Sequence, residues 1–372
     1  MKLSYWEYKE WFSNVDFTIV GSGIVGLSCA RYLKQSYPNS KIIVLEKGIL
    51  PQGASTKNAG FACFGSISEV LSDLENSSED EVLQLVGRRW EGIQLLRANL
   101  GDQAIGFQAD GGHEVFLNQH KESFEKCLEK LTSINELLKP VFKTNAYRVL
   151  ENKFSFQKVC NSYISNPQEG QIDTGLMMGN LLSQVQNMGV RVLNALSVQE
   201  FSEAGEKVLI KTDNLEFYSK KLCIATNGFA SELIKEEVLP ARAQVLITKP
   251  IENLKLYGTF HLEEGYYYFR NIDNRILIGG GRNLNFERET TTEHGHTEDI
   301  QNKLEDLLSK VIIPGKDYEV AHRWSGIMGV GNQKKPIVKQ LSNSVYCGVR
   351  LGGMGIAIGS FVGKELANLV QG

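Results

Sequence analysis

Residues 16–46 constrain the fold more than any other part of the chain. They begin with a short β-rich run, Phe17–Val20, which leads into a complete G-x-G-x-x-G at Gly21–Gly26. An amphipathic stretch follows and ends at Pro38, and a second apolar run covers Lys41–Leu45. Strand, glycine turn, helix and second strand in this order predict the start of a parallel α/β sheet.

Each part of this motif has a physical role in binding a dinucleotide. Gly21 permits the tight turn between strand and helix, Gly23 lets the backbone approach a pyrophosphate, and Gly26 lets the helix pack closely on the strand. The helix N-terminus then offers free N–H groups and a partial positive charge to the phosphates. Glu46 stands where a carboxylate accepts hydrogen bonds from a ribose diol. The residues that we expect in contact with the dinucleotide are Gly21, Ser22, Gly23, Ile24, Val25, Gly26, Glu46 and Lys47.

The alternative interpretation is a glycine turn that holds no ligand. The full series of strand, glycines, helix, second strand and acid in register disfavours it. The motif alone does not distinguish FAD from NAD. A plain NAD dehydrogenase would leave a small-residue loop at 53–60 and a glycine-rich turn near the C-terminus without a function.

Composition restricts the protein class further. Of the 372 residues 42% are hydrophobic, which is typical of a globular protein, and the length favours two domains. Forty Lys and Arg against 43 Asp and Glu give a net charge of −3, so no nucleic-acid partner is expected.

The six cysteines form no C-x-x-C pair and no zinc spacing, which predicts reduced thiols and no metal site. Residues 1–14 lack the apolar core of a signal peptide and no window resembles a transmembrane helix, so we expect a soluble, cytoplasmic protein.

The rest of the chain predicts two domains built from alternating segments. Helical spacing is found at 78–100, 120–138, 176–188, 294–311 and 357–370. Strand patterns are found at 105–117, 190–193, 206–225 and 241–282. We assign a discontinuous α/β, Rossmann-like domain that binds the dinucleotide to residues 1–86, 168–240 and 321–372. A strand-rich α+β domain that binds substrate is assigned to residues 87–167 and 241–320.

Three further motifs accompany the glycine turn over nearly the whole chain. They are Gly-Ala-Ser-x-x-Asn-Ala-Gly at 53–60, Ala225-Thr226-Asn227-Gly228, and the turn Gly352–Ile356 before the last helix. Together the four resemble the D-amino-acid oxidase-like, FAD-dependent amine oxidoreductases, which include glycine and sarcosine oxidases, D-amino-acid dehydrogenases and γ-glutamylputrescine oxidase. The segment Arg323-Trp324-Ser325-Gly326 is similar to a motif of the γ-glutamylputrescine oxidase branch.

The resemblance implies that the dinucleotide is FAD. Residues of the 53–60 loop would lie along the pyrophosphate and the flavin edge, and the backbone of Val198 would meet the adenine. The 226–228 turn would close the adenosine side, and backbone N–H groups of 353–356 would face the O2/N1 end of the flavin. The full set implied is Ala54, Ser55, Thr56, Asn58, Ala59, Gly60, Val198, Thr226, Asn227, Gly228, Gly326, Gly352, Gly353, Met354, Gly355 and Ile356.

The sequence departs from the family pattern in two places. Glycine-oxidase-like members carry an Arg in the C-terminal turn that binds a substrate carboxylate, whereas here Gly353 occupies that place and Arg350 precedes it. The sarcosine oxidases with covalent flavin use a Cys close to the place of His322, where this chain has none. We therefore expect FAD to be bound non-covalently.

Candidates for the substrate pocket come from the strand-rich segments. In a strand Tyr266, Tyr268 and Arg270 point to one face, where two phenols and a guanidinium suit a polar or anionic group. Packing of the aromatic rings on a sheet face is the alternative. Arg350 and Trp324 are the remaining candidates, and both arginines could instead pair with acids between the domains.

The activity that the resemblance implies is oxidation of the C–N bond of an amine or amino acid. A hydride would pass to flavin N5, and water would hydrolyse the resulting imine. Because the flavin carries the difficult step, no catalytic side chain is assigned. The electron acceptor would be O2 or a quinone. Two alternatives stay open: a flavin-dependent dehydrogenase of 2-hydroxy acids, and a flavin-binding protein without activity.

Overall fold

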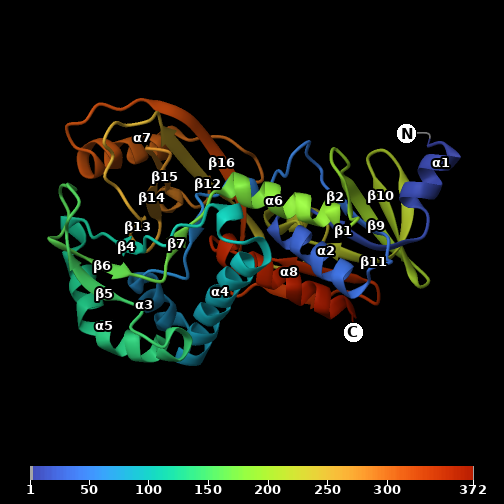
Figure 1. Cartoon of the computed structure of the whole chain (residues 1–372), viewed down its shortest axis with the longest axis horizontal. Coiled ribbons are helices and arrows are strands. Elements are labelled where there is room, and N and C mark those ends of the chain that lie inside the picture. The colour runs from blue at the N-terminus through green and yellow to red at the C-terminus, as the bar shows by residue number, and fades with distance from the viewer. Residues whose placement is uncertain (1–2, 372) are drawn as a thin grey trace.

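Two eight-stranded sheets organise the chain. The computed structural model describes residues 3–371, and in Figure 1 the two sheets form the centres of two lobes that lie side by side. Each sheet collects strands from distant parts of the sequence, so that both lobes are discontinuous along the chain. The architecture is therefore the α/β fold with a second, strand-rich lobe that the sequence predicts.

The first sheet has the order β17-β18-β11-β1-β2-β8, and β10 and β9 continue from β11. Its centre is parallel, because β1 pairs with both β2 and β11 in the same direction. Every residue of β2 is buried, as expected for a strand covered on both faces. The strands are β1 (Val15–Val20), β2 (Ile42–Leu45), β8 (Arg191–Leu193), β9 (Val198–Ala204), β10 (Lys207–Thr212), β11 (Glu216–Ile224), β17 (Ile337–Gln340) and β18 (Val345–Val349).

Three long helices of the described chain belong to this lobe. They are α2 (Ile24–Ser36), α6 (Thr174–Asn187) and α8 (Gly355–Gln371), and α2 packs against both of the others. The strand, helix and strand predicted over residues 16–46 are confirmed as β1, α2 and β2. The terminal helix is also confirmed and begins at Gly355, slightly before its predicted start.

The second sheet has the order β16-β12-β15-β14-β13-β4-β6-β5. Neighbouring strands are antiparallel except for β13 and β4. The strands are β4 (Gly112–Glu114), β5 (Arg148–Glu151), β6 (Ser162–Asn166), β12 (Leu239–Thr248), β13 (Thr259–Leu262), β14 (Tyr267–Ile272), β15 (Arg275–Gly280) and β16 (Val320–Val330). Residues 321–330 thus pair within this sheet, although we assign them to the FAD-binding domain by sequence; the domain boundaries remain a prediction.

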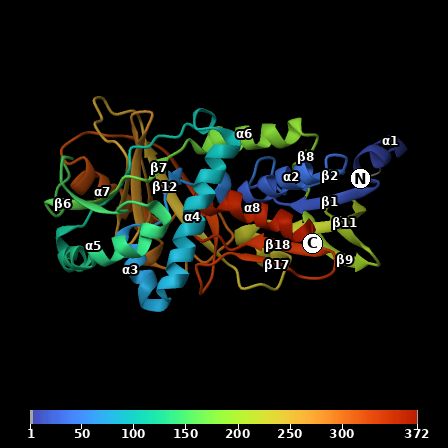
Figure 2. The same cartoon turned by 60° about the horizontal axis from the view of Figure 1, so that its bottom comes forward.

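Four helices surround the second sheet: α3 (Ile67–Asn76), α4 (Glu79–Leu100), α5 (Lys121–Phe142) and α7 (Glu298–Leu307). The long helix α4 contacts α3 and α5 in its own lobe and α8 in the other, and Figure 2 shows it crossing between the lobes.

The shorter elements are β3 (Phe61–Ala62), β7 (Gly170–Gln171), α1 (Tyr5–Glu7) and the helical turns Tyr8–Phe12, Ala54–Thr56, Gln103–Ile105, Asn118–His120, Asn227–Glu232, Arg282–Leu284 and Leu308–Ile312. Within residues 3–371, no helix combines the length and apolar character needed to cross a bilayer.

The structure differs from the sequence prediction in two segments. The strands predicted over 105–117 shrink to β4, because Gly106 and Gly111 adopt positive φ and interrupt the extended chain. Helix α3 is not predicted by sequence, yet it begins with a capping box in which Ser66 and Glu69 satisfy each other's backbone N–H.

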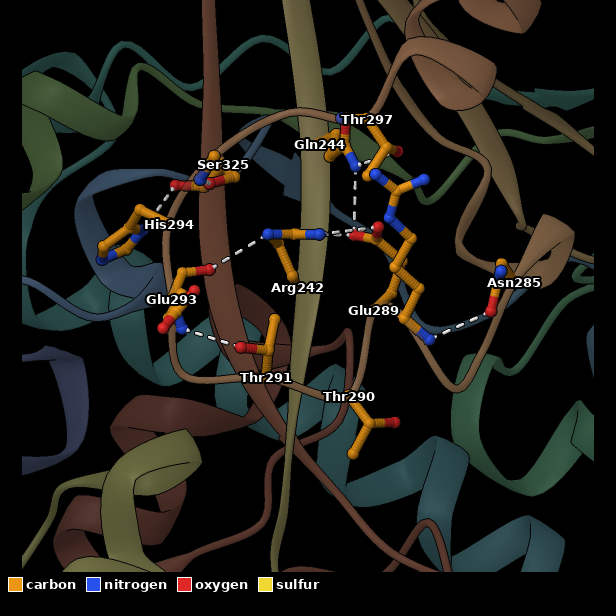
Figure 3. Close-up of polar contacts among 12 residues, drawn as sticks. Arg242, Gln244, Asn285, Glu289, Thr290, Thr291, Glu293, His294, Thr297 and Ser325 are labelled. Carbon is orange, nitrogen blue, oxygen red and sulfur yellow. Dashed lines mark hydrogen bonds and ion pairs between the residues drawn. The ribbon is translucent and has the colours of Figure 1, made fainter.

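A buried ion pair fastens the segment 285–297 to the second sheet. The carboxylate of Glu289 accepts hydrogen bonds from Nε and Nη2 of Arg242 at 2.8 and 2.9 Å, and from the Gln244 amide at 3.0 Å. Figure 3 shows these contacts together with the hydrogen bonds around Thr297 and Ser325. Because Arg242 and Gln244 alternate along β12 with Ala243 and Val245, the opposite face of this strand is left for the site described next.

Candidate active site

A cavity of about 520 Å³ extends between the glycine turn of the first lobe and the sheet of the second. Its wall includes the carboxyl end of β2, the loop 51–61, the turn at 225–227 and the start of α8. It also includes Ala243, Val245 and Tyr268, which face it from the second sheet. Ligands of open α/β sheets bind at the carboxyl ends of the strands, which is where this cavity lies.

The glycines of the turn are required by close contacts. A Cβ on Gly26 would lie 1.9 Å from the carbonyl oxygen of Gly21, so helix α2 and β1 could not approach as they do. Gly21 has a φ of +102° and lies against the carbonyl of Ala225. A Cβ on Gly23 would lie 2.7 Å from Oγ of Ser55, which accepts a hydrogen bond from the N–H of Ile24 at 3.0 Å. The turn and the loop 51–61 therefore form one wall at the N-terminus of α2.

Glu46 is buried at the end of β2 and organises the neighbouring backbone. One carboxylate oxygen accepts hydrogen bonds from the N–H and the hydroxyl of Ser22, at 3.1 and 2.9 Å. The other accepts from the N–H groups of Gly48 and Gln52, at 3.1 and 3.3 Å. The carboxylate thus lies in the cavity wall, held in place by four donors.

Asn58 shapes the small-residue loop. Its side-chain nitrogen donates to the carbonyls of Ala54 and Ser55, at 3.1 and 2.9 Å, and its side-chain oxygen accepts from the N–H of Gly60 at 2.9 Å. The Trp324 indole adds a hydrogen bond to the carbonyl of Lys57 at 2.9 Å. These contacts explain the Asn of the loop, and a Cβ on Gly60 would lie 2.4 Å from the carbonyl oxygen of Ile172, which explains the glycine.

The C-terminal turn closes the other end of the cavity. Helix α8 begins at Gly355, so its first N–H groups have no acceptor within the helix, and residues 352–356 line the cavity. Asn227, which has a φ of +45°, accepts a hydrogen bond from the N–H of Leu351 at 3.1 Å and joins the two turns. The buried hydroxyl of Thr226 has no partner among the described residues, although it borders the cavity.

The structure brings most of the predicted cofactor residues together. Those that line the cavity are Gly21, Gly23, Ile24, Val25, Glu46, Lys47, Ala54, Ser55, Asn58, Ala59, Gly60, Val198, Thr226, Asn227, Gly326, Gly352, Gly353, Met354, Gly355 and Ile356. Four predicted residues do not line it: Ser22, Gly26, Thr56 and Gly228. Ser22 orients Glu46, and Gly26 and Gly228 allow close backbone packing. Thr56 faces a second cavity.

The predicted substrate residues divide between two cavities. Tyr266, Tyr268 and Arg350 line the first, whereas Arg270 and Trp324 line a second cavity of about 290 Å³. We expected Arg270 beside Tyr268 because both point to one sheet face. That face is divided by the loop 51–61, where Phe61 packs edge-on against Tyr268 with ring centroids 5.5 Å apart.

Arg350 is already paired inside the protein. Its guanidinium donates to the carbonyl of Lys335 at 3.1 Å and to the Glu237 carboxylate at 3.4 Å. We left open that this residue pairs with an acid between the domains; it pairs with an acid, but Glu237 belongs to the same assigned domain as Arg350.

Sequence reasoning missed several charged residues of the cavity. Glu69, Glu264, Arg282 and Lys334 lie where the second lobe borders it, and the Lys334 ammonium pairs with Asp73 at 2.5 Å. These residues belong to loops and to the unpredicted helix α3, so no local motif marks them.

A buried histidine was also missed. His261 borders the cavity from β13, and its Nε2 lies 2.5 Å from a carboxylate oxygen of Glu169. Burial opposes its protonation, but the Glu169 carboxylate outweighs burial and raises the pKa of His261 to about 9. With Cys63, these two residues place three potential metal ligand atoms within 4.8 Å of one another. Burial raises the pKa of the Cys63 thiol well above its usual value, which disfavours the thiolate that would bind a metal.

The cavity fits an extended dinucleotide such as FAD. It offers two helix N-termini, a glycine cradle that a side chain at position 23 would fill, a buried acid and an unpartnered hydroxyl. The segment 322–326 contains no cysteine, and its Gly326 lies against Lys57; the cavity-lining Cys63 is a buried thiol whose pKa is raised by burial. The residues present therefore suit a cofactor held by non-covalent contacts.

Comparison with known proteins gives one consistent result. The sequence model of the FAD dependent oxidoreductase family DAO matches residues 16–369. The probable oxidoreductase OrdL of Haemophilus influenzae is 20% identical over 96% of this chain and 83% of its own length. L-proline dehydrogenase from P. horikoshii has a TM-score of 0.77 at 16% identity, covering 96% of this chain and 93% of that one. Glycine oxidase from Geobacillus kaustophilus has a TM-score of 0.76 at 17% identity, covering 96% and 94%. At these identities the two structures establish a shared fold.

Proposed function

The chain belongs to the FAD-dependent oxidoreductase family DAO, and from this premise we propose that it oxidises the C–N bond of an amine or amino acid. The chain is an enzyme that uses FAD. The substrate class is the proposal, and it is supported by similarity to glycine oxidase and L-proline dehydrogenase. The product would be an imine, which water hydrolyses.

One observation carries the choice of an amine: two carboxylates border the substrate side of the cavity, and neither forms an ion pair with a described residue. Glu69 and Glu264 both border the cavity, beside the turn that contains Gly265. Two of the nearby cations are neutralised, because Arg350 pairs with Glu237 and Lys334 with Asp73. A substrate ammonium group is attracted by such a surface, whereas the neutral hydroxyl group of a 2-hydroxy acid gains no such attraction.

Arg282 adds a place for an anionic group on the same substrate. Its guanidinium lies over the Phe286 ring, 4.7 Å from the centroid, and no described residue accepts a hydrogen bond from it. A guanidinium matches a carboxylate with two parallel hydrogen bonds. An amino acid, with its ammonium near Glu264 and its carboxylate near Arg282, would satisfy both ends of this surface.

The side chains of the cavity would bind and orient the substrate. FAD, when bound, supplies the chemistry by accepting the hydride from the carbon next to nitrogen. The carboxylates can accept the proton that the ammonium must lose before oxidation. The rings of Tyr268 and Phe61 and the aliphatic Val245 exclude water from the wall. The electron acceptor, O2 or a quinone, is part of the proposal.

A matched pair of variants tests the role of the acidic surface. Glu264 borders the cavity and its neighbour Glu263 does not. We expect Glu264→Gln to raise KM for the best amine substrate about five- to tenfold, because a charge-assisted contact is lost. Glu263→Gln should leave KM unchanged. Equal kinetics for both variants and the wild type would contradict an ammonium site at Glu264, and turnover of 2-hydroxy acids but not of amines would contradict the proposed function itself.

A further inference from the structure

The second cavity contains a buried charge without a partner. It has a volume of about 290 Å³ and lies on the sheet face of β14, on the other side of the loop 51–61 from the cofactor cavity. Arg270 projects into it and is 2% exposed. Among residues 3–371, none accepts a hydrogen bond from Nε of Arg270, and no carboxylate lies within ion-pair distance of its guanidinium.

Four other polar side chains that border this cavity and are partly buried are satisfied by the protein. The Thr56 hydroxyl donates to the carbonyl of Pro51 at 2.9 Å, and the Thr174 hydroxyl donates to Oδ1 of Asn58 at 2.8 Å. The Trp324 indole donates to Lys57, and Arg275 donates to the carbonyl of Thr248 at 3.0 Å. Among the described residues that border this cavity, Arg270 is therefore the one buried polar side chain, and it lacks a partner.

A buried charge without a partner is unfavourable. Burial lowers the pKa of Arg270 to about 10, which leaves the guanidinium charged at neutral pH. Moving such a group out of water costs several kcal/mol unless a counter-charge and hydrogen bonds compensate. Asp173 and Asp273 act on the Arg270 charge through space but accept no hydrogen bond from it, and a ligand that enters the cavity can supply those hydrogen bonds.

The walls restrict the chemistry of that ligand. Ile247, Ile272, Leu277 and the Trp324 ring provide an apolar surface beside the guanidinium. Asp173 and Asp273 also border the cavity and repel a doubly charged phosphate more strongly than a single carboxylate. A planar carboxylate also matches the fork of a guanidinium in two parallel hydrogen bonds.

We infer that the second cavity is a binding site for a small monocarboxylate with an apolar body, held by the Arg270 guanidinium. The site is separate from the cofactor cavity and does not depend on the proposed reaction. Asn58 borders both cavities, so the ligand would lie against the back of the loop that forms the cofactor wall.

Calorimetric titration of the FAD-loaded enzyme with isovalerate, at constant ionic strength, tests this inference. We expect saturable binding of one isovalerate per chain, and at least tenfold weaker binding of isovaleramide, which has the same apolar body without the charge. Inorganic phosphate should not compete. Competition by phosphate, or equal binding of acid and amide, would overturn the inference, as would the absence of saturable isovalerate binding.

Two variants locate the binding. Arg270→Met should weaken isovalerate binding at least tenfold, and Arg282→Gln, which alters the cofactor cavity, should leave it unchanged. The reverse pattern would place the carboxylate in the cofactor cavity and overturn the inference.

The thermal stability of the ligand-free proteins gives an independent result. Because Arg270→Met removes an unpaired buried charge while keeping a long side chain, its Tm should equal or exceed that of the wild type. A lower Tm, or failure of this variant to fold, would show that the protein itself satisfies the guanidinium and would contradict an unfilled site. A crystal structure of the wild type soaked in isovalerate should show the carboxylate at Arg270.

Discussion

At the scale of single residues, three buried acids in or near the site differ in how far their partners lie along the sequence. Glu46 is the one that the sequence motif marks, because it follows a predicted strand at a fixed place after the glycines. Glu169 and Glu114 carry no such mark: Glu169 meets His261 across 92 positions and Glu114 meets Ser68 across 46. Only the fold brings these pairs together, so sequence patterns could not reveal them.

Glu46→Gln should weaken FAD binding. The carboxylate is buried in the cavity wall, and a hydrogen bond from a ribose hydroxyl to a charged group contributes about 1.5–3 kcal/mol, or at least about tenfold in Kd. Titration of the apoprotein with FAD, followed by flavin fluorescence, measures the change. The Tm of the apoprotein separates loss of binding from loss of folding, since Glu46 also holds four backbone and hydroxyl donors. Unchanged FAD affinity would exclude Glu46 as the ribose acceptor.

His261 should make stability depend on pH. Its pKa is raised from 6.5 to about 9 in the folded state, so its contribution is complete below pH 6.5 and is lost as the pH rises through 9. We expect the free energy of unfolding to fall by an amount on the order of 2 kcal/mol between pH 7 and pH 9.5. His261→Gln should remove most of that slope in urea unfolding at several pH values. An identical slope in the variant would mean that the His261–Glu169 pair is not the cause.

At the scale of elements, the helix and strands that flank the glycine turn of the first lobe are determined by neighbouring residues. The placement of side chains in the second lobe depends on contacts between distant residues. The strand, glycine turn and helix at 15–36 are coded by neighbouring residues, which is why their positions could be predicted. In the second lobe the alternation of Tyr266, Tyr268 and Arg270 predicts one common face, but β14 begins only at Tyr267, and Arg270 lines a different cavity from the two tyrosines. Which cavity each residue reaches depends on where Phe61 packs, and that contact is not local.

The segment 285–297 should depend on its buried ion pair. The Glu289 side chain is 0% exposed, so Glu289→Gln leaves the Arg242 guanidinium buried beside a neutral amide and should cost about 3 kcal/mol of stability. The matched control is the exposed pair Lys249–Glu319, in which the Glu319 side chain is 72% exposed. Glu319→Gln should change the free energy of unfolding by less than about 1 kcal/mol. Equal losses in the two variants, by urea unfolding, would contradict the structural role of Glu289.

At the scale of the whole molecule, the two lobes meet around one cavity whose parts come from most of the chain. The sequence predicts the cofactor half of that cavity, because the glycine turn and the small-residue loops are local motifs. It does not predict the substrate half, where Glu69, Glu264 and Arg282 lie on separate elements. The pairing of Arg350 with Glu237, 113 positions apart, illustrates the same limit.

In the proposed reaction this cavity holds both FAD and an amine, and the electrons of the amine are transferred to the flavin. The most direct measurement is an anaerobic titration of the FAD-loaded protein with a panel of amines, amino acids and 2-hydroxy acids, followed by flavin absorbance. We predict that an amine or amino acid bleaches the flavin band with one equivalent per bound FAD and releases ammonia or a shorter amine. Denaturation should then release the FAD into solution. A flavin band that persists with every amine and is bleached by a 2-hydroxy acid would contradict the account.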